Sequence, residues 1–434
     1  FDTYPDKTGL PKSYSVVPPA DVKAFPEYLR AAGYYCTNNE KTDYQFEAPP
    51  TVWDEVGKTA HWRNRRPGQP FFAVFNIMTT HESQVWMRAG NPLRVSPARI
   101  RVPPYYPDTE TVRQDMARFY SNVSEMDDQV GSIVEQLEAD GLLDNTIVVF
   151  WSDHGDGLPF YKREIYHRGL HVPLIVRFPD KRQAGTTNNR LLSMIDLAPT
   201  VLSLADIPTP RHMQGQAFLG KYAAKQPRQH VFAARDRLDS EYDRVRTVLD
   251  GKLQYVRNHR PELPLYMNVQ YRLQQPIMRE ILKLRDEGKL NADQMFWFKP
   301  TKPAEELYDL QKDPYELNNL AEQSAYRTDL ERMRKLVEQW ERDTKDLGGI
   351  PEKELVRRMW NGGSQPPVTQ PPSGELKGRL VTIDCPTQGA SVGYKTRWGD
   401  PSWQVYRKPF PVKTGDSLYV ITQRVGYQPS VVVK

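Results

Sequence analysis

The sequence predicts an α/β protein in which helices flank a mixed sheet, with a smaller α+β subdomain and a terminal all-β module after it. Three observations support this prediction. Residues 71–78 and 146–151 are uninterrupted apolar runs, typical of strands buried on both faces of a parallel sheet. Between them, residues 109–140 repeat apolar side chains three and four positions apart, as a long amphipathic helix does. The order strand, helix, strand indicates a crossover of an α/β sheet.

The segment before this crossover predicts one helix and one short strand. Residues 1–20 are rich in proline and tyrosine and predict an irregular lead-in. Asp21 is expected to cap a helix that ends at Gly33. Residues 34–37 then predict a short strand, which runs into a polar segment. Lys41 therefore follows a strand end.

The segment after the crossover completes the predicted core. Residues 171–176 predict a further strand, and residues 191–205 form a helix-like apolar segment that Pro199 is expected to break. We assign residues 1–225 to this α/β core.

The second half of the chain changes character. Residues 226–350 contain short strand-like runs and a final amphipathic helix, which predict an α+β subdomain packed on the main sheet. Residues 351–375 are rich in proline and glycine and predict a linker. Residues 376–434 alternate β-rich runs with turn residues and predict a small β-sandwich-like module. Four aromatic residues of the module suit either its interior or a carbohydrate platform, and we expect packing: Trp398, Trp403, Tyr406 and Tyr419.

Composition narrows the classes of function. The chain has 59 basic and 54 acidic residues, a net charge of +5, so its surface is mixed and does not require nucleic acid as a partner. No apolar run approaches the roughly 18 residues of a membrane span. Cys36 and Cys385 lie in different predicted units, so we expect two free thiols rather than a disulfide or a zinc site.

Polar residues suited to binding anions and metals follow the predicted strands. Asp153 and His154 come directly after the strand at residues 146–151, and Lys162 lies on the loop beyond them. Lys41 and His81 follow the two earlier strands. Because ligands bind at the carboxyl ends of strands in open α/β sheets, we expect these residues to gather at one edge. Together they suit a metal site that holds a sulfuryl or phosphoryl group.

Several motifs resemble those of the type I sulfatases of the alkaline phosphatase superfamily, nearest to the heparan N-sulfatase (sulfamidase) branch and to bacterial carbohydrate sulfatases. The resemblance implies an alkaline-phosphatase-like mixed sheet flanked by helices. It also implies hydrolysis of a sulfate ester or N-sulfate on a carbohydrate. The motifs are FPEYLRAAGY at residues 25–34, SDHG at 152–155, VPLI at 172–175, SMIDLAPT at 193–200, EELYDL at 305–310 and DPYELNNL at 313–320.

The resemblance also implies roles for the polar residues. Asp153 and His154 would be two ligands of a calcium ion, with histidine where many relatives have asparagine. Lys41 and Lys162 would contact the sulfate, and His81 would contact it or protonate the leaving group.

Four further positions have open roles. Arg235, Asp236 and Arg237 lie where relatives recognise the sugar, but a salt-bridge network within the subdomain explains them equally well. Asp43 stands where the family usually has histidine, and an acid there would repel sulfate unless it is paired.

One family feature does not appear in these residues. Sulfatases carry two metal-binding acids on the first strand and then a Cys/Ser-x-Pro-Ser-Arg motif, whose first residue becomes the formylglycine nucleophile. Cys36 is followed by Thr-Asn-Asn-Glu, and the run Ser96-Pro97-Ala98-Arg99 has Val95 at the nucleophile position. We therefore expect the first strand, the nucleophile and half of the metal site to lie upstream of Phe1 or on a separate chain. The core would then be incomplete at its N-terminus, with weak calcium binding and no turnover alone.

Three functions follow. The favoured one is a secreted or periplasmic, calcium-dependent sulfatase that acts on a sulfated carbohydrate. The second is a phosphate mono- or diester hydrolase of the same superfamily, although the ligands of a second metal ion are not apparent. The third is a non-catalytic protein that binds sulfated glycans. The sequence indicates neither the sugar and sulfate position nor the oligomeric state.

Overall fold

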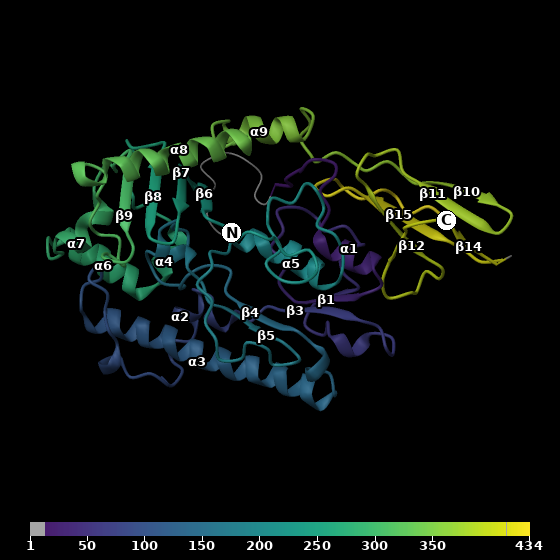
Figure 1. The fold of residues 1–434 in the computed structure, drawn as a ribbon, viewed down its shortest axis with the longest axis horizontal. Helices are drawn as coiled ribbons and strands as arrows, with labels where there is room; N and C mark the ends of the chain where they lie inside the picture. Colours follow the sequence, from purple (N-terminus) through teal and green to yellow (C-terminus); the bar gives the residue numbers. More distant parts are fainter. Residues whose placement is uncertain (1–13, 414) are drawn as a thin grey trace.

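The computed structural model describes residues 14–413 and 415–434 (Figure 1). Most of the predicted irregular lead-in, residues 1–13, lies outside the described residues. Helices and several small sheets make up an α/β region, an antiparallel sheet with its own helices adjoins it, and a β module lies at the opposite end of the molecule (Figure 1). The predicted mixed α/β class is confirmed.

Two small sheets precede the loops of the candidate site. Strand β1 (Tyr35–Asn39) lies between β2 (Glu55–Val56) and β3 (Phe71–Phe75) and is parallel to both. Strand β4 (Val148–Trp151) pairs with β5 (Leu174–Arg177).

The sequence predicted β4 as a strand buried on both faces of a parallel sheet, and this was wrong. Strand β4 is antiparallel to β5 and belongs to a different sheet from β3 in the described part of the chain. The Trp151 side chain at its end is 37% exposed. A run of β-branched and aromatic residues favours an extended backbone, but non-local contacts choose the neighbouring strand.

Helix α1 (Phe25–Ala31) begins later than predicted. The Glu27 carboxylate accepts a hydrogen bond of 3.1 Å from the backbone N–H of Ala24, which occupies the cap position expected for Asp21. An acidic side chain inside the first turn therefore replaces a side-chain cap. Gly33 follows the helix with φ of +95°, a conformation that favours glycine.

Helix α3 (Glu110–Ala139) is the long helix that the apolar spacing predicts. The Thr109 hydroxyl accepts a 3.3 Å hydrogen bond from Val112 N–H and caps the helix. Its buried side chains join one large core with helix α6 (Pro276–Asp286) and with Trp297. The short helices α2 (Gln84–Met87) and α7 (Ala292–Met295) lie near this core.

Two short helices flank β5 in the chain. Helix α4 (His167–Leu170) directly precedes β5. Helix α5 (Leu197–Leu204) contains Pro199 in its first turn, so the predicted break at this proline was wrong. A proline in the first turn removes only an N–H that has no partner within the helix.

An antiparallel sheet forms the predicted α+β subdomain. Its strands follow the order β6 (Val231–Leu238), β7 (Glu241–Leu249), β8 (Leu253–Asn258) and β9 (Glu305–Asp309). Helix α8 (Arg327–Asp343) covers one face of this sheet (Figure 1).

The two faces of this sheet belong to two cores. Leu330, Met333 and Val337 of α8 pack against Val248 and Leu307 of the sheet. Neighbouring strand residues that point the other way join the α3–α6 core. The subdomain is thereby packed onto the α/β region.

The range predicted as a linker is packed against the rest of the chain. It begins with helix α9 (Glu352–Met359), and the following Trp360 is only 6% exposed. The indole N–H of Trp360 donates a 2.9 Å hydrogen bond to Ser15 O. The backbone N–H of Thr369 donates a 3.0 Å hydrogen bond to Gln428 O of the β module.

The β module consists of two antiparallel sheets, as the sequence predicts. One contains β10 (Ser373–Lys377), β11 (Leu380–Asp384) and β14 (Phe410–Pro411). The other contains β13 (Gln404–Val405), β12 (Ser391–Lys395) and β15 (Tyr419–Gln423). A small apolar core includes Val381, Ile383 and Val420.

Two predicted features of the whole chain can be compared with the structure. Cys36 and Cys385 are both free thiols, as predicted, and burial raises the pKa of the Cys36 thiol well above its usual range. Throughout residues 14–413 and 415–434, no helix combines the length and apolar character that a bilayer crossing requires.

Candidate functional site

Three loops meet where the sequence places its candidate residues. Nζ of Lys162 lies 3.1 Å from Nε2 of His81. Lys41 and His154 are close enough to His81 to lower its pKa through their charges. The structure therefore brings together Lys41, His81, His154 and Lys162, which follow three different strands.

Both ring nitrogens of His81 have polar neighbours. A lysine ammonium can only donate, so Nε2 of His81 accepts from Lys162. The other nitrogen, Nδ1, lies 2.9 Å from Ser83 Oγ and 3.3 Å from the backbone N of Ser83, whose N–H is directed at it. Burial and the charge of Lys162 lower the pKa of His81 to about 4. His81 is therefore neutral at neutral pH.

Glu82, the next residue, holds the cations in place. It is 1% exposed, and its carboxylate accepts two 2.9 Å hydrogen bonds from Arg163 and lies 3.1 Å from Nζ of Lys162. Burial alone raises the pKa of Glu82, but the hydrogen bonds and charges of Arg163 and Lys162 outweigh it and lower the pKa to about 2. Asp239 accepts a further 2.9 Å hydrogen bond from Arg163. Glu82 thus orients Lys162 toward His81.

Gly157 allows these two loops to approach each other. A Cβ at this position would lie 2.9 Å from Cα and 3.0 Å from N of Glu82, which is closer than real side chains approach. The Gly157 carbonyl accepts a 2.8 Å hydrogen bond from the Gln275 side chain. Glycine at position 157 therefore allows the loop that carries Lys162 to lie close enough to His81 for the two side chains to meet.

The loop after β1 holds Lys41. Asn38 and Asn76 donate side-chain hydrogen bonds to the Lys41 carbonyl at 2.8 and 3.2 Å. Nζ of Lys41 lies 2.9 Å from the carboxylate of Asp43. The acid that stands where the family usually has histidine is therefore paired with a cation.

Asp153 and His154 present two acceptor atoms to solvent. Nδ1 of His154 donates to the Gly155 carbonyl at 2.6 Å, so Nε2 carries the lone pair, 3.6 Å from Oδ1 of Asp153. Burial lowers the pKa of His154, which favours the neutral ring that a cation needs. Calcium takes about six to eight oxygen ligands, so these two donors alone do not make a calcium site. Within the described parts of the chain, no group of three or more His, Cys, Asp or Glu side chains could hold a metal ion.

Arg235, Asp236 and Arg237, whose roles the sequence left open, make ion pairs within the subdomain and with the segments packed against it. Arg235 is 7% exposed and pairs with Glu164 and with Asp243, the latter at 2.7 Å. Asp236 lies 2.8 Å from Arg246. Arg237 is more accessible than Arg235 and Arg246, and it lies 2.9 Å from Glu352. These contacts are those of a salt-bridge network.

Sequence reasoning did not single out several residues around His81. Glu82 and Arg163 were missed although each directly follows a candidate residue in the chain. Tyr271 was also missed: its ring centre lies 6.5 Å from that of His81 and 5.4 Å from that of Trp86. No local pattern marks Tyr271, because it comes from the other half of the chain.

A hollow of about 340 Å³ lies beside this cluster, at the carboxyl ends of β1 and β3. Asn39, Asn76, Thr79 and Gln84 contribute to its lining. These side chains can hydrogen-bond to hydroxyl groups.

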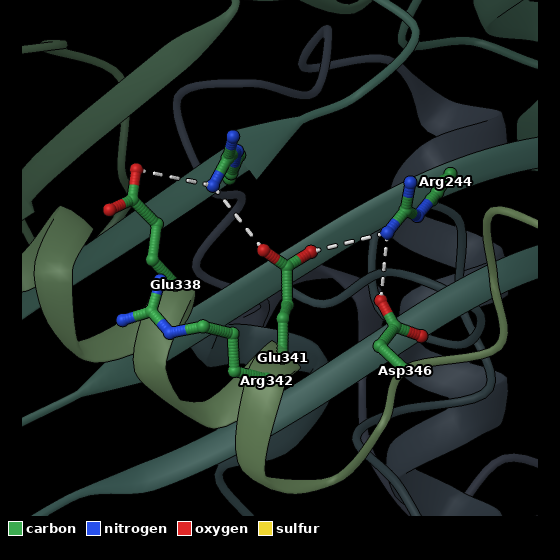
Figure 2. Close-up of a pocket in the computed structure, with 6 residues that line it drawn as sticks. Arg244, Glu338, Glu341, Arg342 and Asp346 are labelled. Atoms are coloured by element: carbon green, nitrogen blue, oxygen red, sulfur yellow. Dashed lines mark hydrogen bonds and ion pairs between the residues drawn. The ribbon is translucent and has the colours of Figure 1, made fainter.

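A second hollow, of about 380 Å³, lies between the sheet and α8 (Figure 2). Its acids are already paired, since Glu341 contacts Arg244 at 3.4 Å and Arg257 at 3.3 Å. Asp346 lies 2.9 Å from Arg244. These ion pairs join α8 to the sheet and make this hollow a poor alternative site.

Sequence comparisons connect the chain to sulfatases. The profile of the family Sulfatase matches residues 36–207. An ulvan-active sulfatase of Formosa agariphila is 43% identical over 472 residues, which covers 100% of this chain and 79% of that protein. Human N-sulphoglucosamine sulphohydrolase is 27% identical over 272 residues, 59% of this chain and 53% of the human protein. The chain thus spans about half the length of the human relative.

Solved structures show the same fold. A putative sulfatase from Bacteroides thetaiotaomicron superposes with a TM-score of 0.55 at 20% identity, over 77% of this chain and 78% of that chain. A 2-O GAG sulfatase superposes with a TM-score of 0.53 at 19% identity, over 79% and 78% of the two chains. The resemblance stated from the motifs is confirmed, and the chain belongs to the sulfatase family.

Proposed function

We propose that this protein hydrolyses a sulfate group on an ulvan-type sulfated polysaccharide. The similarity over the full chain to an ulvan-active sulfatase supports this substrate class. The observation that carries the proposal is the cluster in which Lys162 and Lys41 lie next to a neutral His81.

The two lysines would bind the sulfate. Lys162 is held by Glu82 at 3.1 Å, and Lys41 is held through the contacts of its carbonyl with Asn38 and Asn76. Positive charge fixed in a partly buried site stabilises negative charge that develops on the sulfate oxygens, at little cost of reorganisation.

His81 would assist the leaving group. An anionic sulfate ester placed between Lys162 and His81 offsets the lysine charge and raises the pKa of His81. Nε2 can then carry a proton to the departing oxygen. Residues 1–434 contain no Cys/Ser-x-Pro-Ser-Arg run, so attack on sulfur is assigned to no residue of this sequence.

Asp153 and His154 would contribute two ligands to the calcium ion that the family resemblance implies. A bound cation would add positive charge near the sulfate. Because two donors bind calcium weakly, calorimetric titration of the chain should show a weak event that Asp153→Asn removes. Tight binding to this chain would contradict the assignment.

We also propose that the protein works outside the cytoplasm, in the periplasm or as a secreted protein. A polysaccharide does not cross a membrane unaided, so its sulfatase must reach it outside. Fractionation of the native organism, followed by immunoblotting, tests this location.

Sulfate release tests the proposed activity. The product of the complete gene is incubated with ulvan, and free sulfate is measured by ion chromatography. Removal of the Lys162 charge by Lys162→Gln should lower kcat about 100-fold or more, in the range found when one stabilising donor is removed. Lys58→Gln, at an exposed loop lysine, is the matched control and should retain full activity.

Two outcomes would select the alternatives. Release of phosphate from phosphate esters in preference to sulfate from ulvan would indicate a phosphoesterase. Binding of ulvan without any sulfate release by the complete gene product would indicate a glycan-binding protein.

A further inference from the structure

The outer face of one sheet in the β module carries aromatic and basic side chains. Lys395 of β12 and Tyr419 of β15 are directly opposite each other and so project from the same face. Their neighbours Tyr394 and Val420 project from the other face and belong to the module core. Lys395 and Tyr419 therefore lie outside that core.

Three further residues continue this surface. The ring centres of Trp398 and Tyr419 are 5.3 Å apart. Nζ of Lys434 lies 5.7 Å from the Tyr419 ring centre, and Nζ of Lys395 lies 5.0 Å from that of Trp403. We name this set the aromatic patch: Lys395, Trp398, Trp403, Tyr419 and Lys434.

The aromatic residues of the module divide into one that packs in the module core and others that lie in the patch. Tyr406 packs in the module core, and its hydroxyl accepts a 3.1 Å hydrogen bond from Ile383 N–H. Trp398, in contrast, is 61% exposed. The expectation that these aromatics serve packing fits Tyr406 and does not account for Trp398. A large exposed ring beside a second ring is typical of a binding surface.

Positive charge is concentrated in the same module. Residues 376–434 contain nine basic and three acidic residues, a net charge of +6. The preceding 375 residues contain the other 50 basic and 51 acidic residues, a net charge of −1. In the described part of the chain, neither Lys395 nor Lys434 has a carboxylate within ion-pair distance. Their charges are available to an anionic partner.

The module is held tightly against the α/β region, beside α1 and β1 (Figure 1). Arg30 of α1 donates a 2.6 Å hydrogen bond to the carbonyl of Trp403, and Nζ of Lys23 donates to Ser391 Oγ at 2.8 Å. A Cβ at Gly389 would lie 1.8 Å from Ala20 O, so only glycine permits this approach. A ligand on the patch would therefore keep a constant position relative to the strand that leads to Lys41.

We propose that the aromatic patch binds a sulfated polysaccharide at a site separate from the hydrolytic one. Aromatic rings stack against the C–H faces of sugar rings, and the two lysines pair with sulfate groups. The choice of a sulfated polysaccharide over other polyanions rests on the proposed function. The patch would hold the polymer while the sulfate of another residue is removed.

Affinity electrophoresis of the full chain tests this binding. Ulvan is cast in the gel, and dextran sulfate and uncharged dextran are cast in parallel gels. Retardation by ulvan is expected for the unchanged protein. The variants Trp398→Ala with Tyr419→Ala, and Lys395→Gln with Lys434→Gln, should each weaken ulvan binding about tenfold, as loss of central aromatic or cationic contacts does.

Matched controls separate the patch from general charge and from misfolding. Arg407→Gln with Lys408→Gln removes the same charge from exposed positions of the same module and should retain nearly full binding. Tyr222→Ala removes a half-exposed aromatic ring elsewhere and should change nothing. All variants should keep the thermal midpoint of the unchanged protein.

Three results would overturn the proposal. They are equal losses in the patch and control variants, undiminished binding in both patch variants, and binding to duplex DNA as tight as to ulvan at the same ionic strength. Sulfate release from a small aryl sulfate is measured in parallel with the product of the complete gene, carrying the same substitutions. If the patch variants lose polymer binding and still release sulfate normally, the patch is separate from the hydrolytic site. If the unchanged protein binds ulvan and releases no sulfate, only the proposed function is contradicted.

Discussion

The ammonium group of Lys162 lies 3.1 Å from Nε2 of His81, its partner 81 positions earlier in the chain. This contact makes the imidazole an acceptor and leaves it uncharged. It also places one fixed positive charge where the sulfate would bind.

The first prediction concerns pH. In the folded protein, burial and the charge of Lys162 lower the pKa of His81 from 6.5 to about 4, and Lys41 and His154 add to this while Glu82 opposes it. Between these values the unfolded chain binds the additional proton, so stability falls as pH decreases from about 6.5 to about 4. His81→Asn cannot titrate and should lose less stability over this interval. Urea midpoints at the two ends of the interval measure the difference, and identical shifts in both proteins would refute the lowered pKa.

The second prediction concerns Glu82. Glu82→Gln leaves Arg163 and Lys162 buried without their carboxylate, and we expect a loss of about 3 kcal/mol in the free energy of unfolding. Glu354→Gln removes an equally charged partner from an exposed pair of arginines on α9, where solvent screens the charges and the expected loss is much smaller. Urea denaturation of both variants gives the comparison. Equal losses would mean that Glu82 has no special part in holding the cations.

The third prediction compares two glycine-to-alanine substitutions that should change the stability of the protein in opposite directions. Gly157→Ala forces a methyl group against the backbone of Glu82 and should cost about 1–3 kcal/mol. Gly131→Ala lies inside α3, where a Cβ meets nothing within 4 Å, and should stabilise the protein by about 0.5–1 kcal/mol. Thermal midpoints should therefore move in opposite directions. If Gly157→Ala loses sulfate binding and Gly131→Ala does not, the close approach of Gly157 to Glu82 is required for the sulfate site.

Part of this arrangement could be predicted from the sequence. Apolar runs locate strand ends, and the polar residues after them are the ones that meet, as Lys41, His81 and Lys162 do. The spacing in α3 and its Thr109 cap are equally local signals. Such features depend on a few neighbouring residues, which is why they can be recognised without a structure.

Other features depend on partners far away in the chain. The apolar run of β4 gave no sign that it would pair antiparallel with β5. Nothing in the sequence around Glu82 distinguishes it from other acidic residues. It pairs with Arg163 and Lys162 only because Gly157 lets their loop approach it. In the β module, alternation along β12 and β15 separates core from surface only after their register is known.

The last prediction decides between two roles of Arg235. Its guanidinium is buried between Glu164 and Asp243, while Lys302 also lies 2.9 Å from Asp243. If the residue serves this network, Arg235→Met should lower the free energy of unfolding by about 3 kcal/mol, because buried acids lose hydrogen bonds.

In the complete gene product the same substitution should leave KM for ulvan unchanged, since both terminal nitrogens of the guanidinium already contact carboxylates. Arg237→Gln, at a more exposed ion pair with Glu352, should cost less than about 1 kcal/mol. A rise in KM for Arg235→Met at unchanged stability would instead assign Arg235 to the sugar. Because a buried arginine cannot reach a polysaccharide without breaking two ion pairs, we expect the stability of the fold, and not substrate affinity, to respond.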